Sequence, residues 1–278
     1  MILITVTHTK GSVPREAGTW MVVTADGIDG KNIGTLGGGN VEFQAIATAR
    51  ELLGTGRSDF QLRCEPSPVP NNSRVHRKFA LGPSLGQCCG GVMDLSFEPI
   101  DAAQLALLQA KQDVACKPIA LFGGGHVGRA IVNIFSTLPY RITWIDSRDE
   151  IFPEGLSSKV ACEHSDPVQS AVASLATGSA VLIMSFSHAE DLEIVQQCLI
   201  RNRASTAQGA IANLPFIGLI GSKTKWMTFQ NRLRERGFTD AELAQVTCPI
   251  GVSGISGKEP EVIAVAVAAQ LLQKLYTL

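Results

Sequence analysis

The sequence "IALFGGGHVGRAIVNIFSTL", from Ile119 to Leu138, contains the pattern of a complete strand–turn–helix unit. Its first four residues are apolar, as in a buried strand, and the apolar residues after the glycines recur at helical spacing. Between them lies G-x-G-x-x-G, formed by Gly123, Gly125 and Gly128. In a strand–turn–helix unit such glycines permit a tight turn, close approach of the backbone to a phosphate, and close packing of the helix on the strand. We therefore predict that a Rossmann-like unit begins here.

The chain after this stretch repeats the same order of elements. The strand "RITWID" ends at Asp146, and three further apolar runs follow, two of them leading into helical patterns and the last forming a helix that starts near Pro260. Short apolar strands that alternate with helices favour a parallel sheet covered on both faces. Asp146 stands where an acid would accept a hydrogen bond from a ribose hydroxyl. The glycines and Asp146 together predict a site for a nucleotide such as NAD(P), although the same glycines could serve only the turn and its packing.

Two later turns carry further candidate binding residues. In "GLIGSKTK", at a strand-to-helix junction, Ser222 can cap the helix and Lys223 adds positive charge. This pattern predicts a phosphate site. The alternative is that the lysine is only a solvated surface charge. In "SFSHAED", His188 lies beside Ser187 and Glu190, which have capping-box spacing. Ligands of open α/β sheets bind at the carboxyl ends of strands, so His188 is a candidate site residue, although capping explains much of this pattern.

The amino-terminal part has a different character. The full chain has 278 residues, and this length favours two domains. Strands are predicted at residues 2–8, 20–24 and 92–98, with a helix after Asn40 as its N-cap. We predict an α/β protein in which a mixed α/β N-terminal domain, residues 1–113, precedes a C-terminal Rossmann-like parallel-sheet domain, residues 114–278.

The predicted first domain contains a second glycine-rich turn before a helix. In "TLGGGNVE", Gly37, Gly38 and Gly39 could cradle an anion with their backbone amides. In "GSVPREAG", Arg15 carries a guanidinium that can grip a phosphate or a polar heterocycle at two points. Each motif alone is typical of an ordinary turn, but together they predict a site for a phosphorylated ligand.

Two adjacent cysteines, Cys88 and Cys89, lie in "LGPSLGQCCGGVMDLSFEP" between glycines. The glycines keep the space around the sulfurs open, so the pair is predicted to be presented to a ligand and to act as the catalytic thiols. The alternative is that each cysteine is a small buried hydrophobe.

Composition narrows the function classes. Hydrophobic residues make up 45% of the chain, charged residues 18%, and the net charge is -1, so no basic field favours nucleic acid or an anionic membrane. The seven cysteines have no C-x-x-C spacing and the five histidines are scattered, so we expect no metal site from sequence-local ligands. No leader or membrane-spanning pattern is recognised, so the cytoplasm is the expected compartment.

Motifs along nearly the whole chain together resemble the XdhC/CoxI family. They are "VTHTKGSVPREAGTWMVV", "GTLGGGNVE", "LGQCCGG", "LFGGGHVGRA", "ITWIDSR", "GLIGSKTK" and "CPIG...GISGKEPEVIAVAVAAQLL". Members of the family usually begin with an additional helix, whereas here the first predicted strand starts at residue 2, which suggests a shortened or wrongly assigned start.

The resemblance implies a chaperone-like accessory factor of xanthine dehydrogenase rather than a turnover enzyme. Such a factor binds the molybdenum cofactor (molybdopterin), protects it while a cysteine desulfurase supplies sulfur, and inserts it into the dehydrogenase; a homodimer is also implied. Cys89 matches the cysteine of the family's CGG motif and Cys88 the additional one of the XdhC branch. Two alternatives stay open: an NAD(P)-dependent oxidoreductase with a redox-active cysteine pair, and an interaction protein without chemistry.

Overall fold

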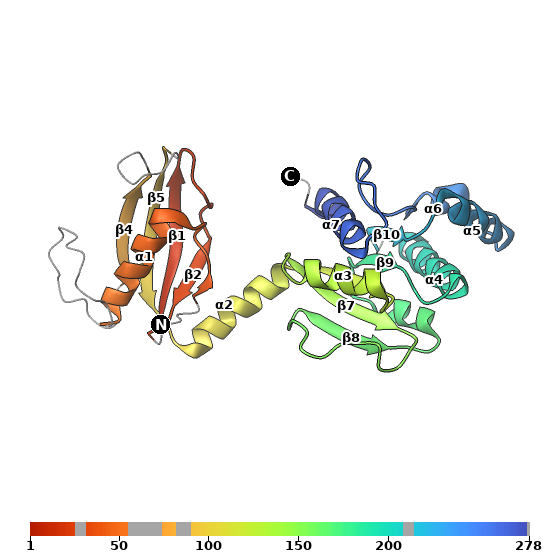
Figure 1. Cartoon of the computed structure of the whole chain (residues 1–278), viewed down its shortest axis with the longest axis horizontal. Helices are drawn as coiled ribbons and strands as arrows, with labels where there is room; N and C mark the ends of the chain where they lie inside the picture. The colour runs from red at the N-terminus through yellow and green to blue at the C-terminus, as the bar shows by residue number, and fades with distance from the viewer. Residues whose placement is uncertain (26–31, 55–73, 82–89, 208–213, 277–278) are drawn as a thin grey trace. The chain divides into compact units, whose positions relative to one another are not determined.

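The structure is a computed structural model that describes residues 1–25, 32–54, 74–81, 90–207 and 214–276. The chain separates into two compact units, Met1–Gln109 (unit 1) and Ala110–Leu278 (unit 2), which can be followed by colour in Figure 1. The division falls inside α2 (Ala102–Ala115). The limits suggested by the sequence, 1–113 and 114–278, stay a prediction.

Unit 1 is built on one antiparallel sheet of five strands in the order β3-β2-β1-β5-β4. The strands are β1 (Ile2–Lys10), β2 (Trp20–Val23), β3 (Ile33–Gly34), β4 (Val75–Ala80) and β5 (Val92–Pro99). Because strand side chains alternate between faces, Ile2, Ile4 and Val6 enter one core while Leu3 enters another.

Each face of this sheet packs against a helix. Helix α1 (Gly39–Leu52) buries Val41, Ala45 and Ala49 in the core that contains Ile4, and it crosses the sheet in Figure 1. The opposite face packs Leu3, Val22 and Ile100 against Leu105 and Leu108 of α2. The mixed α/β character predicted for this part is confirmed.

Unit 2 contains a sheet of six strands in the order β11-β10-β9-β6-β7-β8, and all its pairings are parallel. The strands are β6 (Lys117–Phe122), β7 (Tyr140–Asp146), β8 (Val160–His164), β9 (Ala180–Ile183), β10 (Phe216–Leu219) and β11 (Val246–Thr247). The chain builds outward from β6 to β8 and then returns to place β9 on the other side of β6. The prediction of a Rossmann-like parallel sheet is confirmed, and its topological switch point lies between β6 and β9.

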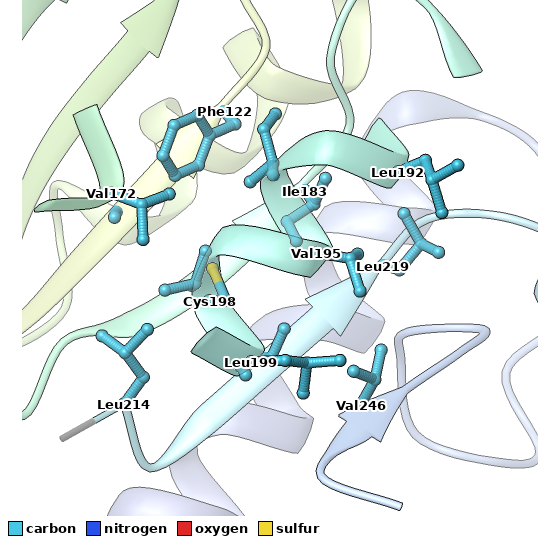
Figure 2. Packing of buried hydrophobic residues seen from close by; sticks show 14 of the residues in the cluster. Phe122, Val172, Ile183, Leu192, Val195, Cys198, Leu199, Leu214, Leu219 and Val246 are labelled. Atoms are coloured by element: carbon cyan, nitrogen blue, oxygen red, sulfur yellow. The ribbon is translucent and has the colours of Figure 1, made fainter. Parts of the chain in front are cut away.

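Helices cover both faces of the parallel sheet. Helices α3 (His126–Phe135) and α7 (Pro260–Leu275) share a core with one face, and α7 begins at the predicted proline. The other face packs against the 3-10 helix η2 (Val168–Ser174), α4 (His188–Ala207), α5 (Lys223–Glu235) and α6 (Asp240–Leu243). Figure 2 shows this second core, in which Cys198 lies among Val172, Leu199 and Leu214.

Candidate functional site

In the glycine turn after β6, two of the three predicted glycines are required by close contacts, and the third has free space around it. Gly123 has φ 124°, and a Cβ there would lie 2.0 Å from the carbonyl oxygen of Met184. A Cβ on Gly128 would lie 2.1 Å from the carbonyl oxygen of Gly123, so both glycines are required by turn and packing. Gly125, the N-cap of α3, has no atom within 4 Å of a Cβ placed on it. Of the three predicted glycines, Gly125 leaves space in which a phosphate could approach the helix N-terminus.

Asp146 lies beside this turn at the end of β7, and its side chain is 1% exposed. Its Oδ2 accepts from the Gly124 amide at 2.5 Å and from Nη2 of Arg148 at 2.9 Å. Its Oδ1 accepts from Nε of Arg148 at 2.8 Å and from the Arg148 amide at 2.9 Å. A carboxylate offers about four acceptor positions, so the donors of Gly124 and Arg148 fill them.

The same contacts set the charge state of Asp146. Burial raises the pKa of its carboxyl, but the hydrogen bonds from the Arg148 guanidinium and from the two amides outweigh burial, so the pKa lies below its ordinary value. Asp146 is therefore an ionised internal anchor for the glycine turn. It can accept a ribose hydroxyl only if Arg148 moves, so its predicted contact with a ribose stays a prediction.

Arg148 and Phe186, which the sequence interpretation missed, complete this corner of unit 2. The guanidinium of Arg148 lies 4.7 Å from the ring centroid of Phe186, a residue 68% exposed in the turn after β9. The Ser147 hydroxyl donates to Glu190 at 2.7 Å, and the Phe186 amide donates to the same carboxylate at 3.2 Å. The turns after β7 and β9 are thus joined although β6 lies between them. An arginine two residues beyond Asp146 was the available signal.

The remaining predicted residues of unit 2 lie at ends of neighbouring strands. Ser222 is the N-cap of α5 and accepts from the Lys225 amide at 3.1 Å, while Lys223 is exposed. Lys225 instead turns inward and pairs with Asp191 at 2.5 Å. His188 is exposed at the start of α4. The structure supplies no direct contact that joins His188 or Lys223 to the glycine turn, so their ligand roles stay predictions.

In unit 1, predicted motifs from distant parts of the sequence converge at one end of the sheet. A Cβ on Gly37 would lie 2.7 Å from Cβ of Pro14 and 3.2 Å from Cγ of Arg15. A Cβ on Gly91, the second glycine after Cys89, would lie 2.3 Å from the carbonyl oxygen of Ser12. The turn that carries Arg15 therefore contacts both the triple-glycine turn and the exit from the double cysteine.

The triple-glycine turn already holds an anion that belongs to its own helix. Oε2 of Glu42 accepts from the Leu36 amide at 2.8 Å, from the Gly38 amide at 3.0 Å and from the Thr35 hydroxyl at 2.6 Å. Burial raises the pKa of Glu42, but these bonds and the charge of Arg15 lower it overall. A cradle formed by all the amides of Gly37, Gly38 and Gly39 would require Glu42 to leave.

Cys88 and Cys89 lie outside the described residues, and their predicted catalytic role stays a prediction. Of the described cysteines, Cys198 is fully buried, and burial raises the pKa of its thiol to about 12. Burial also raises the pKa of Cys248 to about 11, with smaller opposing effects from Lys225 and Asp191. These two thiols are protonated at neutral pH and poor nucleophiles.

Within the described ranges, no group of three or more His, Cys, Asp or Glu side chains is arranged to hold a metal ion. Among those same residues, none of the helices has both the length and the apolar character needed to cross a bilayer.

Comparisons with known proteins cover both units. The model of the XdhC Rossmann domain matches residues 119–271, and that of the XdhC and CoxI family matches residues 1–64. The uncharacterized protein YqeB of Escherichia coli (strain K12) is 26% identical over 269 residues, which are 96% of this chain and 42% of that protein. The chain thus spans less than half of the length of this relative.

A solved structure is similar over both units. A Bacillus halodurans protein described as a xanthine dehydrogenase has a TM-score of 0.72 and 18% sequence identity, over 99% of this chain and 91% of that chain. This likeness shows a shared fold.

Proposed function

Because the chain belongs to the XdhC and CoxI family, we propose that it is an accessory protein of xanthine dehydrogenase that binds the molybdenum cofactor, supports its sulfuration and inserts it. Unit 1 is the proposed cofactor-binding part. In this proposal a cysteine desulfurase supplies the sulfur, the protein acts as a homodimer, and its role is delivery rather than turnover.

The observation that carries the proposal is the convergence of three motifs in unit 1. In the turn that carries Arg15, Ser12 contacts Gly91 while Pro14 and Arg15 contact Gly37, so the residues that follow Cys89 lie against the turn that carries the guanidinium. Arg15 is exposed, and a Cβ on Gly38 would meet no atom within 4 Å. This corner therefore offers a cation and open space next to the end of the thiol segment.

The exposed guanidinium of Arg15 and the open space at Gly38 fit a phosphorylated ligand. Bound molybdenum cofactor supplies a phosphate and a metal centre that accepts sulfur. In the proposal, the Arg15 guanidinium grips the phosphate at two points. In the same proposal, the thiolates of Cys88 and Cys89 would bind the metal or carry sulfur for it. Since Glu42 fills the amides of Leu36 and Gly38, Arg15 rather than the glycine amides provides the positive charge.

The experiment measures cofactor retention. The wild type, Cys89→Ala, Cys88→Ala and Arg15→Gln would be purified from cofactor-producing cells, with molybdenum and oxidised pterin measured per chain. Cys162→Ala is the matched control, because Cys162 is an exposed cysteine of unit 2. We expect Cys89→Ala and Arg15→Gln to lose most of the cofactor and the control to retain it. Full retention by Cys89→Ala, with undiminished activation of apo xanthine dehydrogenase, would refute the thiol role.

Unit 2 supports a second, separable proposal, a nucleotide site. The open position at Gly125, at the N-terminus of α3 and the switch point of the sheet, favours it. If the protein were instead an NAD(P)-dependent oxidoreductase, purified protein would oxidise NADH or NADPH when given a dithiol-reducible acceptor. Under the accessory-protein proposal the nucleotide is bound without hydride transfer.

A further inference from the structure

The contacts of Arg148 define which part of its guanidinium remains available. Nε and Nη2 donate to the two oxygens of Asp146, and one face of the group lies against Phe186. Nη1 donates to no acceptor within the described part of the chain, and the side chain is 35% exposed. Two anchoring contacts therefore fix the guanidinium while one edge faces solvent with its N–H groups unused.

The position of Arg148 matches a particular part of a dinucleotide. In a Rossmann unit the residues at the end of the second strand lie beside the ribose 2′ position of the adenosine half. An acid there accepts from the 2′-hydroxyl of NAD, and an arginine nearby accommodates the 2′-phosphate of NADP. Here β7 is the second strand, Asp146 has its acceptor positions filled, and Arg148 presents donors.

We propose that the nucleotide site of unit 2 selects ligands with a 2′-phosphate on adenosine, the NADP class, through Arg148. The inference rests on the nucleotide site proposed above and deepens it. A hydroxyl at the 2′ position finds no unfilled acceptor on Asp146, whereas a 2′-phosphate receives charge-assisted hydrogen bonds from the Nη1 edge. The exposed ring of Phe186 keeps the guanidinium plane in place.

The turn that carries Arg148 is held by contacts from several elements. Arg129 of α3 donates to the Ile151 carbonyl at 3.0 Å, and Nε2 of His164 lies 3.1 Å from the Ser147 carbonyl. Acidic groups are also near: Glu190 interacts electrostatically with Arg148, and Asp149 lies 3.3 Å from His164. The hydrogen bonds from Ser147 and Phe186 disperse the charge of Glu190, so the open edge of Arg148 is still an attractive place for an anion.

The test compares three adenosine nucleotides on the full chain by calorimetry. Adenosine 2′,5′-bisphosphate carries the proposed group, adenosine 3′,5′-bisphosphate has matched charge at the wrong position, and 5′-AMP lacks the second phosphate. We expect the 2′,5′ compound to bind the wild type about tenfold more tightly than either of the others.

Two variants and a control assign the preference to Arg148. Arg148→Gln should remove the preference, and Asp146→Asn with Arg148→Gln should do so without leaving a buried carboxylate unpaired, which protects against loss of folding. Arg141→Gln is the control, because Arg141 is an exposed arginine near the opposite end of the same strand. The control should retain the preference, and circular dichroism would verify that each variant is folded.

The outcomes separate this inference from the proposals on which it rests. Equal binding of the three nucleotides, or a preference that survives in the folded double variant, overturns selection by Arg148 and leaves the nucleotide site standing. Binding of none of them overturns both the inference and the nucleotide site. Neither result bears on cofactor retention in unit 1, which depends on Arg15 and Cys89.

Discussion

The two triple-glycine turns have similar sequences, but their backbone amides bind different acceptors. Both Gly37–Gly39 and Gly123–Gly125 precede a helix and look alike as candidate anion sites. In unit 1 the amides on the turn bind Glu42, a side chain of the helix that the turn introduces. In unit 2 the Gly124 amide binds Asp146 from the neighbouring strand, while the space at Gly125 stays open.

This difference shows that a glycine turn specifies amide donors but not their acceptor. Amides at a helix N-terminus favour any nearby carboxylate, whether it belongs to a ligand or to the chain. A carboxylate one turn into the helix, such as Glu42, reaches back to the turn locally. Where the helix offers none, as at His126 to Arg129, the turn stays accessible to a ligand.

Adding a methyl group at Gly123, in the glycine turn of unit 2, should cause the greatest loss of stability. Gly123→Ala places a Cβ 2.0 Å from a backbone oxygen at φ 124°, so the turn and β9 cannot keep their contact. We expect unit 2 to lose roughly 4 kcal/mol or more of stability, through overpacking added to backbone strain. Hydrogen exchange measured by mass spectrometry would report each unit separately.

The control for this substitution is Gly178→Ala in the same unit. Gly178 has φ 81° but no atom within 4 Å of its Cβ position. It should cost only about 1–2 kcal/mol, from the backbone conformation alone. Equal losses for the two variants would show that strain, not collision with Met184, decides the role of Gly123.

A smaller loss is expected when the internal anion of unit 2 is removed. Asp146→Ala leaves the Gly124 amide and the Arg148 guanidinium without their acceptor, and we expect about 3 kcal/mol of destabilisation, since Arg148 is partly exposed to water. The folded pKa of Asp146 lies below its ordinary value of 3.8. Its contribution is therefore present above pH 3.8 and is lost as the pH falls below that value.

Acid titration of the variant checks this assignment. Asp146→Asn should flatten the fall of unit 2 stability below about pH 3.8 relative to the wild type. An unchanged acid profile in unit 2 would mean that other carboxylates set it and that the Asp146 contacts contribute little.

The corresponding change in unit 1 should cost less and create an anion site. Glu42→Ala frees the amides of Leu36 and Gly38 at a partly exposed position, so we expect a loss of about 1–2 kcal/mol. Sulfate should then restore part of this stability, measured against chloride at equal ionic strength. Glu51→Ala, an exposed glutamate of the same helix, is the control and should show neither effect. Absence of a sulfate response would indicate that the turn rearranges once Glu42 is gone.

Much of the fold was predictable because its signals are local. The run from Ile119 to Leu138 contains strand, turn and helix within twenty residues, and its period changes at the glycines. Strand β4 (Val75–Ala80) was not predicted, because only Phe79 among its residues is buried and the polar "HRK" hides the alternation. It is an edge strand whose existence depends on pairing with β5.

The site was less predictable because its contacts are distant in sequence. Arg148, two residues beyond Asp146, was a local signal, but nothing local indicates that Glu190 would join the turns on either side of β6. The contact of Glu42 was easier to predict from the sequence, because Glu42 follows Gly38 by one helical turn. Spacing revealed which groups could bind, but only the fold decided which of them were already bound.

The open glycine at the N-terminus of α3 should be the most tolerant of the glycines compared. Gly125→Ala should cost only about 0.5–1 kcal/mol, from the weaker N-cap preference of alanine, because φ is -70° and the added methyl group meets no protein atom. Gly38→Ala is its counterpart in unit 1, equally open but at φ 77° and ψ -166°, a backbone region that is essentially restricted to glycine, and should cost about 1–3 kcal/mol. If Gly125 makes no packing contact that the fold requires, the methyl group of the alanine variant should affect only a ligand that approaches the N-terminus of α3. A variant that loses no more than this small amount of stability but binds nucleotide clearly more weakly would meet that condition. A variant that unfolds would show that Gly125, like Gly123 and Gly128, is required for packing.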